Sequence, residues 1–254
     1  MSTSSSAEAA LDALRPDLFA GRQALVTGGT SGIGAAVAEA FSRRGAKVLA
    51  TGATDAEVTA ARSRLPDIRF EPLDVRDAAA VAALVEGLPR LDHLANCAGV
   101  IRRGAELDPD AFADVVDINL NGTMRACAAA RPRLAAARGT IVNTASMLAF
   151  FGGGLVPGYS ASKGGVAQLT KSLAIAYAGD GIRVNAVAPG WIATPLTAPL
   201  RADPARNDAI LARTPLGRWG DPAEVAAGVL FLSSPLAGFV TGAVLTIDGG
   251  YLVA

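Results

Sequence analysis

The sequence predicts an α/β fold in which a doubly wound, parallel sheet of seven strands is flanked by helices on both faces. Short apolar runs alternate with longer alanine-rich stretches along the chain, and a glycine-rich turn follows the first apolar run. The chain has 254 residues, of which 51% are hydrophobic, so one large core is possible. We expect a polar extension over residues 1–18 and one catalytic domain over residues 19–254.

The first half of the chain predicts four strands separated by three helices. The expected strands cover residues 23–27, 47–51, 68–74 and 91–98. The first helix covers residues 33–44 and ends at Gly45. Thr54 and Glu57 have the spacing of a capping box that begins the second helix, and the third helix covers residues 78–87. Pro72 weakens the third strand because proline donates no ladder hydrogen bond.

The second half predicts long helices and three further strands, at residues 139–144, 182–188 and 243–247. One helix covers residues 109–137, where Pro132 is expected to bend or divide it. Another covers residues 158–178. Residues 191–220 are expected to be irregular and to form a lid over the substrate, the alternative being a static loop. Asp221 and Pro222 have the pattern of a capped helix start.

A dinucleotide site is expected where the first strands end. The turn from Thr27 to Gly34 joins the first strand to the first helix, and its glycines permit a backbone to approach a pyrophosphate at the helix N-terminus. Asp74 and Asn96 close the third and fourth strands, at the edge where open α/β sheets bind ligands. Asp74 can accept from an adenine amino group or cap the next helix.

The preference for NAD or NADP depends on the end of the second strand. An acidic residue there binds a ribose 2′-hydroxyl and repels a 2′-phosphate. Asp55 follows this strand but also suits the helix start, and neither an arginine nor a lysine stands in the adjacent stretch. The sequence therefore favours NAD over NADP.

Three side chains predict proton transfer to or from a carbonyl or alcohol oxygen. If residues 159–163 are helical, Tyr159 and Lys163 lie one turn apart on the same face, and Ser146 is thirteen residues upstream. A nearby ammonium favours phenolate and lowers the pKa of a tyrosine toward neutrality. The hydroxyl of Ser146 can hold the same substrate oxygen. The alternative interpretation, without a catalytic role, is a solvated lysine beside a half-buried tyrosine.

Composition excludes several other functions. The formal net charge is +0 and no basic block occurs, so nucleic acid is not an expected partner. The two cysteines, Cys97 and Cys127, lie in apolar stretches, and the single histidine, His93, argues against a histidine-rich metal site. No apolar run is long enough to span a bilayer, and the N-terminus lacks the pattern of a secretion signal. We expect a cytoplasmic protein that acts on a small molecule.

These motifs together resemble the short-chain dehydrogenases/reductases, over residues 20–254, which implies a Rossmann fold and an NAD(P)-dependent enzyme that interconverts secondary alcohols and ketones. The resemblance implies that Tyr159 is the acid or base, that Lys163 lowers its pKa and holds the nicotinamide ribose, and that Ser146 orients the substrate oxygen. It implies that Asn119 steadies a water between Lys163 and solvent, and that the protein is a homotetramer. Cys97 stands where the family usually has asparagine. The implied cofactor-binding residues are Gly28, Thr30, Ser31, Gly32, Ile33, Gly34, Asp74, Val75, Asn96, Ala98, Gly99, Tyr159, Lys163, Pro189, Gly190, Ile192 and Thr194.

Local strings, among them residues 98–103, 145–153 and 217–220, are closest to dehydrogenases of 2-deoxygluconate and 2-keto-3-deoxygluconate, with gluconate 5-dehydrogenases nearby. The resemblance implies a sugar acid or related polyol as substrate, and a carboxylate calls for a guanidinium. The candidate substrate residues are Ser146, Arg102, Arg103, Met147, Trp191 and Arg201. Each arginine can instead be a surface or interface charge. The alternatives are a 3-oxoacyl-[acyl-carrier-protein] reductase and a catalytically silent binding protein on the same scaffold.

Overall fold

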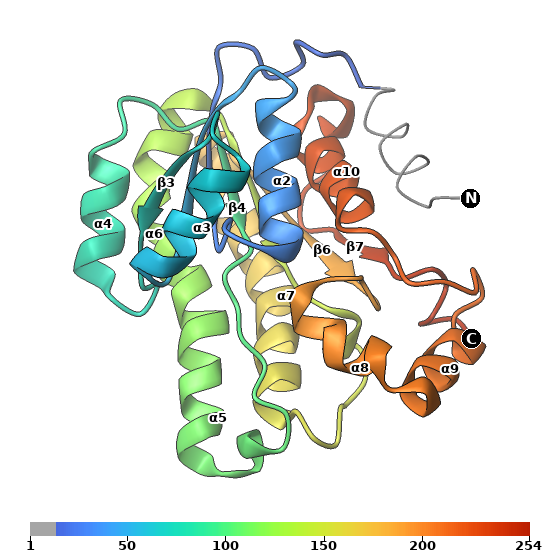
Figure 1. Cartoon of the computed structure of the whole chain (residues 1–254). Helices are drawn as coiled ribbons and strands as arrows, with labels where there is room; N and C mark the ends of the chain where they lie inside the picture. The colour runs from blue at the N-terminus through green and yellow to red at the C-terminus, as the bar shows by residue number, and fades with distance from the viewer. Residues whose placement is uncertain (1–13) are drawn as a thin grey trace.

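The computed structural model describes residues 14–254, so most of the predicted N-terminal extension lies outside the described residues. Its seven strands form one parallel sheet in the order β3-β2-β1-β4-β5-β6-β7 (Figure 1). The strand order reverses between β1 and β4, and such a reversal opens a crevice at the carboxyl ends of the strands. The predicted fold is confirmed.

The strands begin and end within a few residues of their predicted bounds. They are β1 Gln23–Thr27, β2 Lys47–Gly52, β3 Arg69–Pro72, β4 His93–Asn96, β5 Thr140–Thr144, β6 Arg183–Pro189 and β7 Val244–Ile247. The helices in the described part of the chain are α2 Gly32–Ser42, α3 Asp55–Arg64, α4 Ala78–Glu86, α5 Pro109–Val116, α6 Gly122–Ala137, α7 Pro157–Tyr177, α8 Ala198–Ala202, α9 Pro204–Arg213 and α10 Pro222–Ser233. Among the described residues, no helix is both long and apolar enough to cross a membrane.

Helices cover both faces of the sheet. Helices α2, α3 and α10 pack on one face through side chains such as Val37, Val58 and Val229. Helices α4, α6 and α7 pack on the other, where Val81 and Leu134 are among the buried residues (Figure 1). Because the inner strands β1, β2 and β5 are buried on both sides, their sequences are largely apolar rather than alternating.

Two helix starts follow the predicted capping pattern. Thr54 caps α3, where its hydroxyl accepts from the backbone N–H of Glu57 at 3.2 Å. The Glu57 carboxylate accepts from the N–H of Ala53 at 2.8 Å rather than from Thr54. Asp221 and Glu224 form a complete capping box at the start of α10. These caps satisfy N–H groups that have no partner within the helix.

The predicted long helix over residues 109–137 is interrupted, but not at Pro132, which lies inside α6. The interruption is a short π-helical segment, Asp117–Asn121, between α5 and α6. Its wider turn re-aims the side chain of Asn119, which is fully buried. Pro132 therefore does not divide the helix. The break lies instead at Asn119, whose side chain has partners on other elements.

Residues 191–220 are more regular than predicted. They contain the short 3₁₀ segment Pro195–Thr197 and the helices α8 and α9, which lie beyond the end of β6 (Figure 1). Asp203 caps α9 by accepting from the N–H groups of Ala205 and Arg206. Prolines at the first positions of these helices explain the error, since proline suits a helix start as well as a loop.

His93 predicts a loss of stability in acid. Its ring stacks on Phe41 and meets Phe19 edge-on, and its Nδ1 lies 2.8 Å from the hydroxyl of Thr140. Burial lowers the pKa of His93 from 6.5 to about 4. Because the unfolded chain binds this proton first, folding stability is complete above pH 6.5 and falls as the pH drops from 6.5 to 4, by up to about 3 kcal/mol.

Urea unfolding at several pH values checks this prediction, with His93→Gln as the comparison. The variant has no imidazole to titrate, so its free energy of unfolding should change less between pH 6.5 and pH 4. Burial raises the pKa of Asp92, but hydrogen bonds from Arg90, Gln23 and Arg22 lower it to about 2. Asp92 therefore titrates below this window. Equal slopes for the two proteins would show that His93 is not responsible.

Candidate functional site

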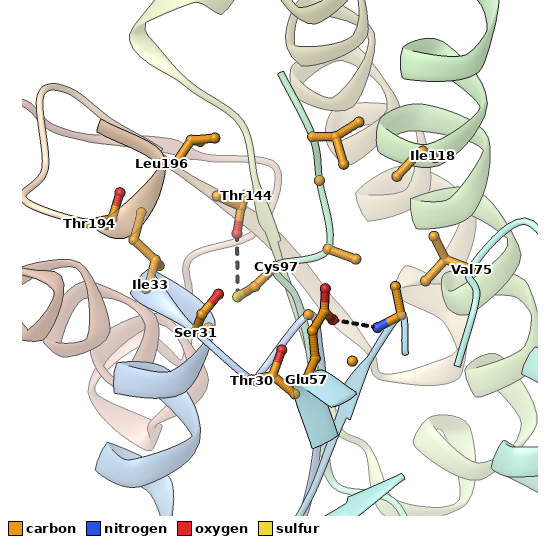
Figure 2. A pocket seen from close by; sticks show the side chains of 18 of the residues that line it. Thr30, Ser31, Ile33, Glu57, Val75, Cys97, Ile118, Thr144, Thr194 and Leu196 are labelled. Carbon is orange, nitrogen blue, oxygen red and sulfur yellow. Dashed lines mark hydrogen bonds between the residues drawn. The ribbon is translucent and has the colours of Figure 1, made fainter. Parts of the chain in front are cut away.

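A cavity of about 400 Å³ lies at the carboxyl ends of the strands, between β1 and β4. Figure 2 shows Ser31 and Ile33 on one side of it, Val75 and Ile118 on the other, and Thr30 and Glu57 together at one end. Thr144, at the end of β5, and Cys97 lie at its centre, where the Thr144 hydroxyl is 3.6 Å from the Cys97 sulfur. The cavity therefore gathers residues from the ends of strands β1 to β6 and the loops that follow them.

The glycine-rich turn cannot carry side chains at two positions. Gly28 has φ +65°, and a Cβ there would lie 2.6 Å from the Cα of Ala98. A Cβ on Gly34 would overlap the carbonyl oxygen of Gly28. Helix α2 begins at Gly32 with Ser31 as an uncapped N-cap, so its first N–H groups point into the cavity without a side-chain partner. This is a cradle for a pyrophosphate.

The end of the cavity near β2 and β3 is acidic. Glu57 reaches it from α3, and Gly52 leaves room there, since a Cβ on Gly52 would meet Thr30 and Glu57. Asp74 and Arg76 also line it. Arg76 forms ion pairs with Asp74 and with Asp114 on α5. Its hydrogen bonds to Asp74 lower the pKa of that carboxyl. The guanidinium of Arg76 is therefore already neutralised by two carboxylates.

At the other end lie Tyr159 and Lys163, on the first two turns of α7. The Lys163 ammonium is 5.5 Å from the centre of the Tyr159 ring and donates to the carbonyl of Thr144 at 2.6 Å. A Cβ on Gly99 would lie 3.5 Å from that ammonium, so Gly99 leaves the space beside it open. The hydroxyl of Ser146 acts on the phenol of Tyr159 and lowers its pKa. The three predicted groups converge.

The electrostatics of these groups differ from the expectation. Burial raises the pKa of Tyr159, the hydrogen bond from Ser146 lowers it, and the negative charge of Glu106 raises it further, with a net rise. Burial also lowers the pKa of Lys163 to about 8. The depression of the Tyr159 pKa expected from Lys163 is not among these effects, and desolvation sets the direction of the shift instead.

Asn119 holds two elements together. Its amide donates to the carbonyl of Val100 at 3.0 Å and to the hydroxyl of Ser162 at 3.1 Å, and its oxygen accepts from the N–H of Val100 at 2.8 Å. Its backbone carbonyl accepts from the hydroxyl of Thr123 at 2.7 Å. Asn119 thus joins the loop after β4 to α7, beside Lys163.

A second cavity of about 480 Å³ shares Tyr159 with the first and extends under α8 and α9. Ser146, Met147 and Trp191 line it, mostly with apolar neighbours such as Ile101, Leu148 and Leu200. Arg103 enters from the loop after β4, and Arg206 and Asp203, paired with each other at 3.4 Å, enter from α9. The acid–base group and a hydroxyl therefore stand where the two cavities meet.

Most of the predicted site residues line one of these cavities, and several do not. Arg102 points away and pairs with Asp114, and Arg201 lines neither cavity. Asn96 is buried against Asn143 and Thr27 within the sheet. Gly190 lines the second cavity, Ile192 lines a third one near the end of β7, and Pro189 lines none of the three. Asp55 is exposed on α3, outside the first cavity.

Sequence reasoning missed Glu57, Arg76, Arg206 and Glu106. The Thr54–Glu57 spacing had identified Glu57 as a cap, and that pattern also places it beside the end of β2. The other three depend on contacts between segments far apart in the chain. No local pattern distinguishes them from surface charges.

Proteins with similar sequences and structures carry names of enzymes of this kind. The sequence profile of the family described as enoyl-(acyl carrier protein) reductase matches residues 28–252. The cis-4-hydroxycyclohexanecarboxylate dehydrogenase of Sinomonas cyclohexanicum is 44% identical over 92% of this chain and 98% of its own length. The 2-dehydro-3-deoxy-D-gluconate 5-dehydrogenase of Pseudoalteromonas atlantica is 39% identical over 91% and 96%.

Among solved structures, a gluconate 5-dehydrogenase from Burkholderia cenocepacia in complex with NADP and tartrate has a TM-score of 0.87. It is 31% identical in sequence, and the match covers 94% of this chain and 98% of that one.

Proposed function

The chain belongs to the short-chain dehydrogenase/reductase family and is an NAD(P)-dependent oxidoreductase, and we propose that it interconverts a secondary alcohol and a ketone on a hydroxy acid of the sugar-acid type. The observation that carries the proposal is the position of Tyr159, which lines both cavities, with Ser146 beside it in the second cavity. A substrate oxygen held there lies between the dinucleotide cradle and the pocket under α8 and α9.

The residues that would hold the dinucleotide are the turn Gly28–Gly34, Asp74, Val75, Ala98 and Gly99, with Thr194 and Lys163 at the nicotinamide end. When bound, the nicotinamide accepts or returns a hydride and brings a positive charge in its oxidised form. Tyr159 takes the proton of the substrate hydroxyl during oxidation and returns it during reduction. Ser146 holds the same oxygen, and Lys163 stabilises the phenolate and binds the ribose.

The second cavity supports a substrate with a carboxylate and a compact carbon body. Arg103 supplies a guanidinium on a wall that is otherwise largely apolar, and Arg206 can exchange its partner Asp203 for a substrate anion. The names of two relatives denote carboxylates, a hydroxycyclohexane carboxylate and a dehydro-deoxygluconate. We assign the substrate-facing role to Ser146, Arg103, Met147, Trp191 and Arg206, with α8 and α9 as a lid.

Steady-state rates with a panel of substrates test the proposal. We expect turnover of 2-keto-3-deoxygluconate or cis-4-hydroxycyclohexanecarboxylate, and a much higher KM for the matched alcohol that lacks the carboxylate. Acetoacetyl thioesters test the acyl-carrier alternative. Turnover of the thioester alone would reject the hydroxy-acid proposal in favour of a 3-oxoacyl reductase, and no turnover of any alcohol or ketone would favour a binding protein.

For the cofactor, we propose a preference for NAD in which Glu57 selects against a 2′-phosphate. One oxygen of Glu57 accepts from Ala53 N–H, which leaves the other for a ribose hydroxyl. Lys163 and Arg76 are the cations among the described residues that line this cavity, and Arg76 is paired with Asp74 and Asp114. The Burkholderia relative was solved with NADP, so the preference is a property proposed for this chain.

Glu57→Gln keeps an oxygen for Ala53 but removes the negative charge. Because the repulsion of the 2′-phosphate is removed, we expect the ratio of kcat/KM for NADP to that for NAD to rise about tenfold. This change corresponds to ~1.4 kcal/mol. Asp55→Asn is the matched control, because it removes an exposed acid from the first turn of the same helix. An equal change in both variants would argue for a general charge effect, and no change in Glu57→Gln would refute the role of Glu57.

We further propose a homotetramer located in the cytoplasm. Ile175, on the helix that bears Tyr159, is 81% exposed, and Leu236 and Phe239 are exposed as well, which supports association between copies. Cys97 and Cys127 are free thiols, as is usual in a reducing compartment. Light scattering on the purified protein measures the oligomeric state.

A further inference from the structure

The first turn of α7, which carries Tyr159, lacks a helix cap of its own. Its N-cap is Val156, which has no side-chain hydrogen bond to offer, and Pro157 follows at the first helical position. A short distance before it lies the triplet Gly152–Gly154. Glycine has more backbone conformational freedom than any other residue type. The turn therefore needs support from another segment to hold Tyr159 in one place.

That support comes from Glu106, a carboxylate that is only 1% exposed. It lies in the 3₁₀ segment Ala105–Leu107, in the loop between β4 and α5. One oxygen accepts from the backbone N–H of Tyr159 at 2.8 Å, and the other accepts from the N–H of Arg102 at 2.6 Å. A buried carboxylate is rare unless such partners compensate its desolvation, so both bonds are strong and specific.

A second contact runs beside the first. The N–H of Gly104 donates to the carbonyl of Leu155 at 2.7 Å, which fixes the chain just before α7 to the same loop. Gly104 has φ +82°, a backbone conformation that turns the chain so that Glu106 faces inward. The loop and the first turn of α7 are thus joined at two points.

We propose that Glu106 is the positioning residue for Tyr159, and that it joins the substrate loop at Arg102 to the first turn of α7. The inference rests on the proposed role of Tyr159 as acid and base. Because Arg103 follows Arg102 and lines the substrate cavity, the same carboxylate sets the distance between the substrate anchor and the phenol. Its negative charge also favours the first turn of a helix, where N–H groups are unpaired.

The charge of Glu106 predicts a change in the pH dependence of the oxidation rate, which a merely structural role would not produce. The groups around the phenol are Ser146, Lys163 on the same helix, and Arg103, Arg206 and Asp203 in the shared cavity. Among the effects on Tyr159, the charge of Glu106 acts to raise its pKa. Removing that charge lowers the pKa of Tyr159, so the rising limb of the oxidation rate moves to lower pH.

Glu106→Gln and Glu106→Asp separate the two effects. The glutamine keeps the length, loses the charge and presents one N–H group to a backbone donor, whereas the shorter aspartate keeps the charge but cannot reach both N–H groups. We expect both to lower kcat about 10- to 100-fold, since a displacement of about 1 Å costs that much. Only Glu106→Gln should shift the pH limb, and the dinucleotide Kd should stay unchanged in both.

Asp108→Asn is the matched control, because the side chain of Asp108 caps α5 through the N–H groups of Asp110 and Ala111, both outside α7. It should lower the melting temperature and leave kcat and the pH limb as they are. Folding is followed by circular dichroism, and if Glu106→Gln does not fold, Glu106→Asp decides through kcat. A kcat for the folded Glu106 variants equal to that of the wild type would overturn the proposal. An active Tyr159→Phe would instead overturn the proposed function on which it rests.

Discussion

Replacing Tyr159 with phenylalanine is expected to lower kcat for alcohol oxidation about a thousandfold while leaving the dinucleotide Kd unchanged. The ring remains in place between the two cavities, but the proton of the substrate hydroxyl has no acceptor. The contact of Ser146 with the substrate oxygen survives, so binding of the alcohol should change little. The loss therefore falls on kcat rather than on KM.

The pH profile makes the prediction sharper. Burial and the charge of Glu106 raise the pKa of Tyr159 in the protein alone, so the wild-type oxidation rate should rise with pH as the phenol ionises. Tyr159→Phe should show no such rise. Stopped-flow and steady-state rates from pH 6 to pH 10.5 measure both profiles, and calorimetric titration with NAD measures the Kd.

Tyr177→Phe is the control for loss of a phenol from α7. Tyr177 is 4% exposed and packs among Leu134, Ile182 and their neighbours at the far end of the helix. Its loss should affect stability alone. If Tyr159→Phe oxidised alcohols at the wild-type rate, or if Tyr177→Phe lost activity equally, the assignment of Tyr159 as base would be wrong.

The strands and the catalytic groups could be predicted because their signals are local. A parallel strand buried on both faces is a short apolar run, and caps such as Thr54 and Asp221 mark the helix starts that follow. Tyr159 and Lys163 are one helical turn apart, so a local rule places them on one face. The glycine turn has the same advantage, because its glycines stand together in one short stretch between a predicted strand and a predicted helix.

The residues that were missed depend on distant contacts. Glu106 is bound through backbone N–H groups of Arg102 and Tyr159, and backbone groups leave no trace in residue identity. Arg102 and Arg103 are identical in the sequence, yet one pairs with Asp114 and the other enters the substrate cavity. Neither periodicity nor composition distinguishes two adjacent arginines. Their different contacts depend on α5, which places Asp114 beside Arg102.

The break at Asn119 illustrates the same limit. Pro132 is a visible signal for a bend, but the helix continues through it. The actual break follows from side-chain bonds between Asn119, Val100 and Ser162, which come from three segments of the chain. A π-helical turn costs regular hydrogen bonding, and these tertiary bonds offset that cost.

Replacing Lys163 with methionine is expected to lower kcat/KM for oxidation about a hundredfold and to weaken NAD binding. Lys163 is 4% exposed, and its ammonium donates to Thr144 at 2.6 Å beside the open space at Gly99. Methionine fills the same volume without a charge or a donor. An arginine should not rescue the activity, because a planar guanidinium does not fit where a compact ammonium is enclosed.

The pH dependence of NAD binding isolates the charge. Burial lowers the pKa of Lys163 to about 8, so the ammonium is present at neutral pH and is lost as the pH rises through 8. The wild-type Kd for NAD should therefore rise about tenfold between pH 7 and pH 9, which corresponds to ~1.4 kcal/mol, whereas Lys163→Met should show no step.

Lys171→Met is the control, because Lys171 lies on the exposed side of the same helix. It should bind NAD and respond to pH as the wild type does. A step near pH 8 that persisted in Lys163→Met would assign the titration to another group. Lys163→Met has no ammonium in the enclosed space. The missing charge beside the phenol and the ribose would therefore explain both its low oxidation rate and the absence of a pH-dependent step in its Kd for NAD.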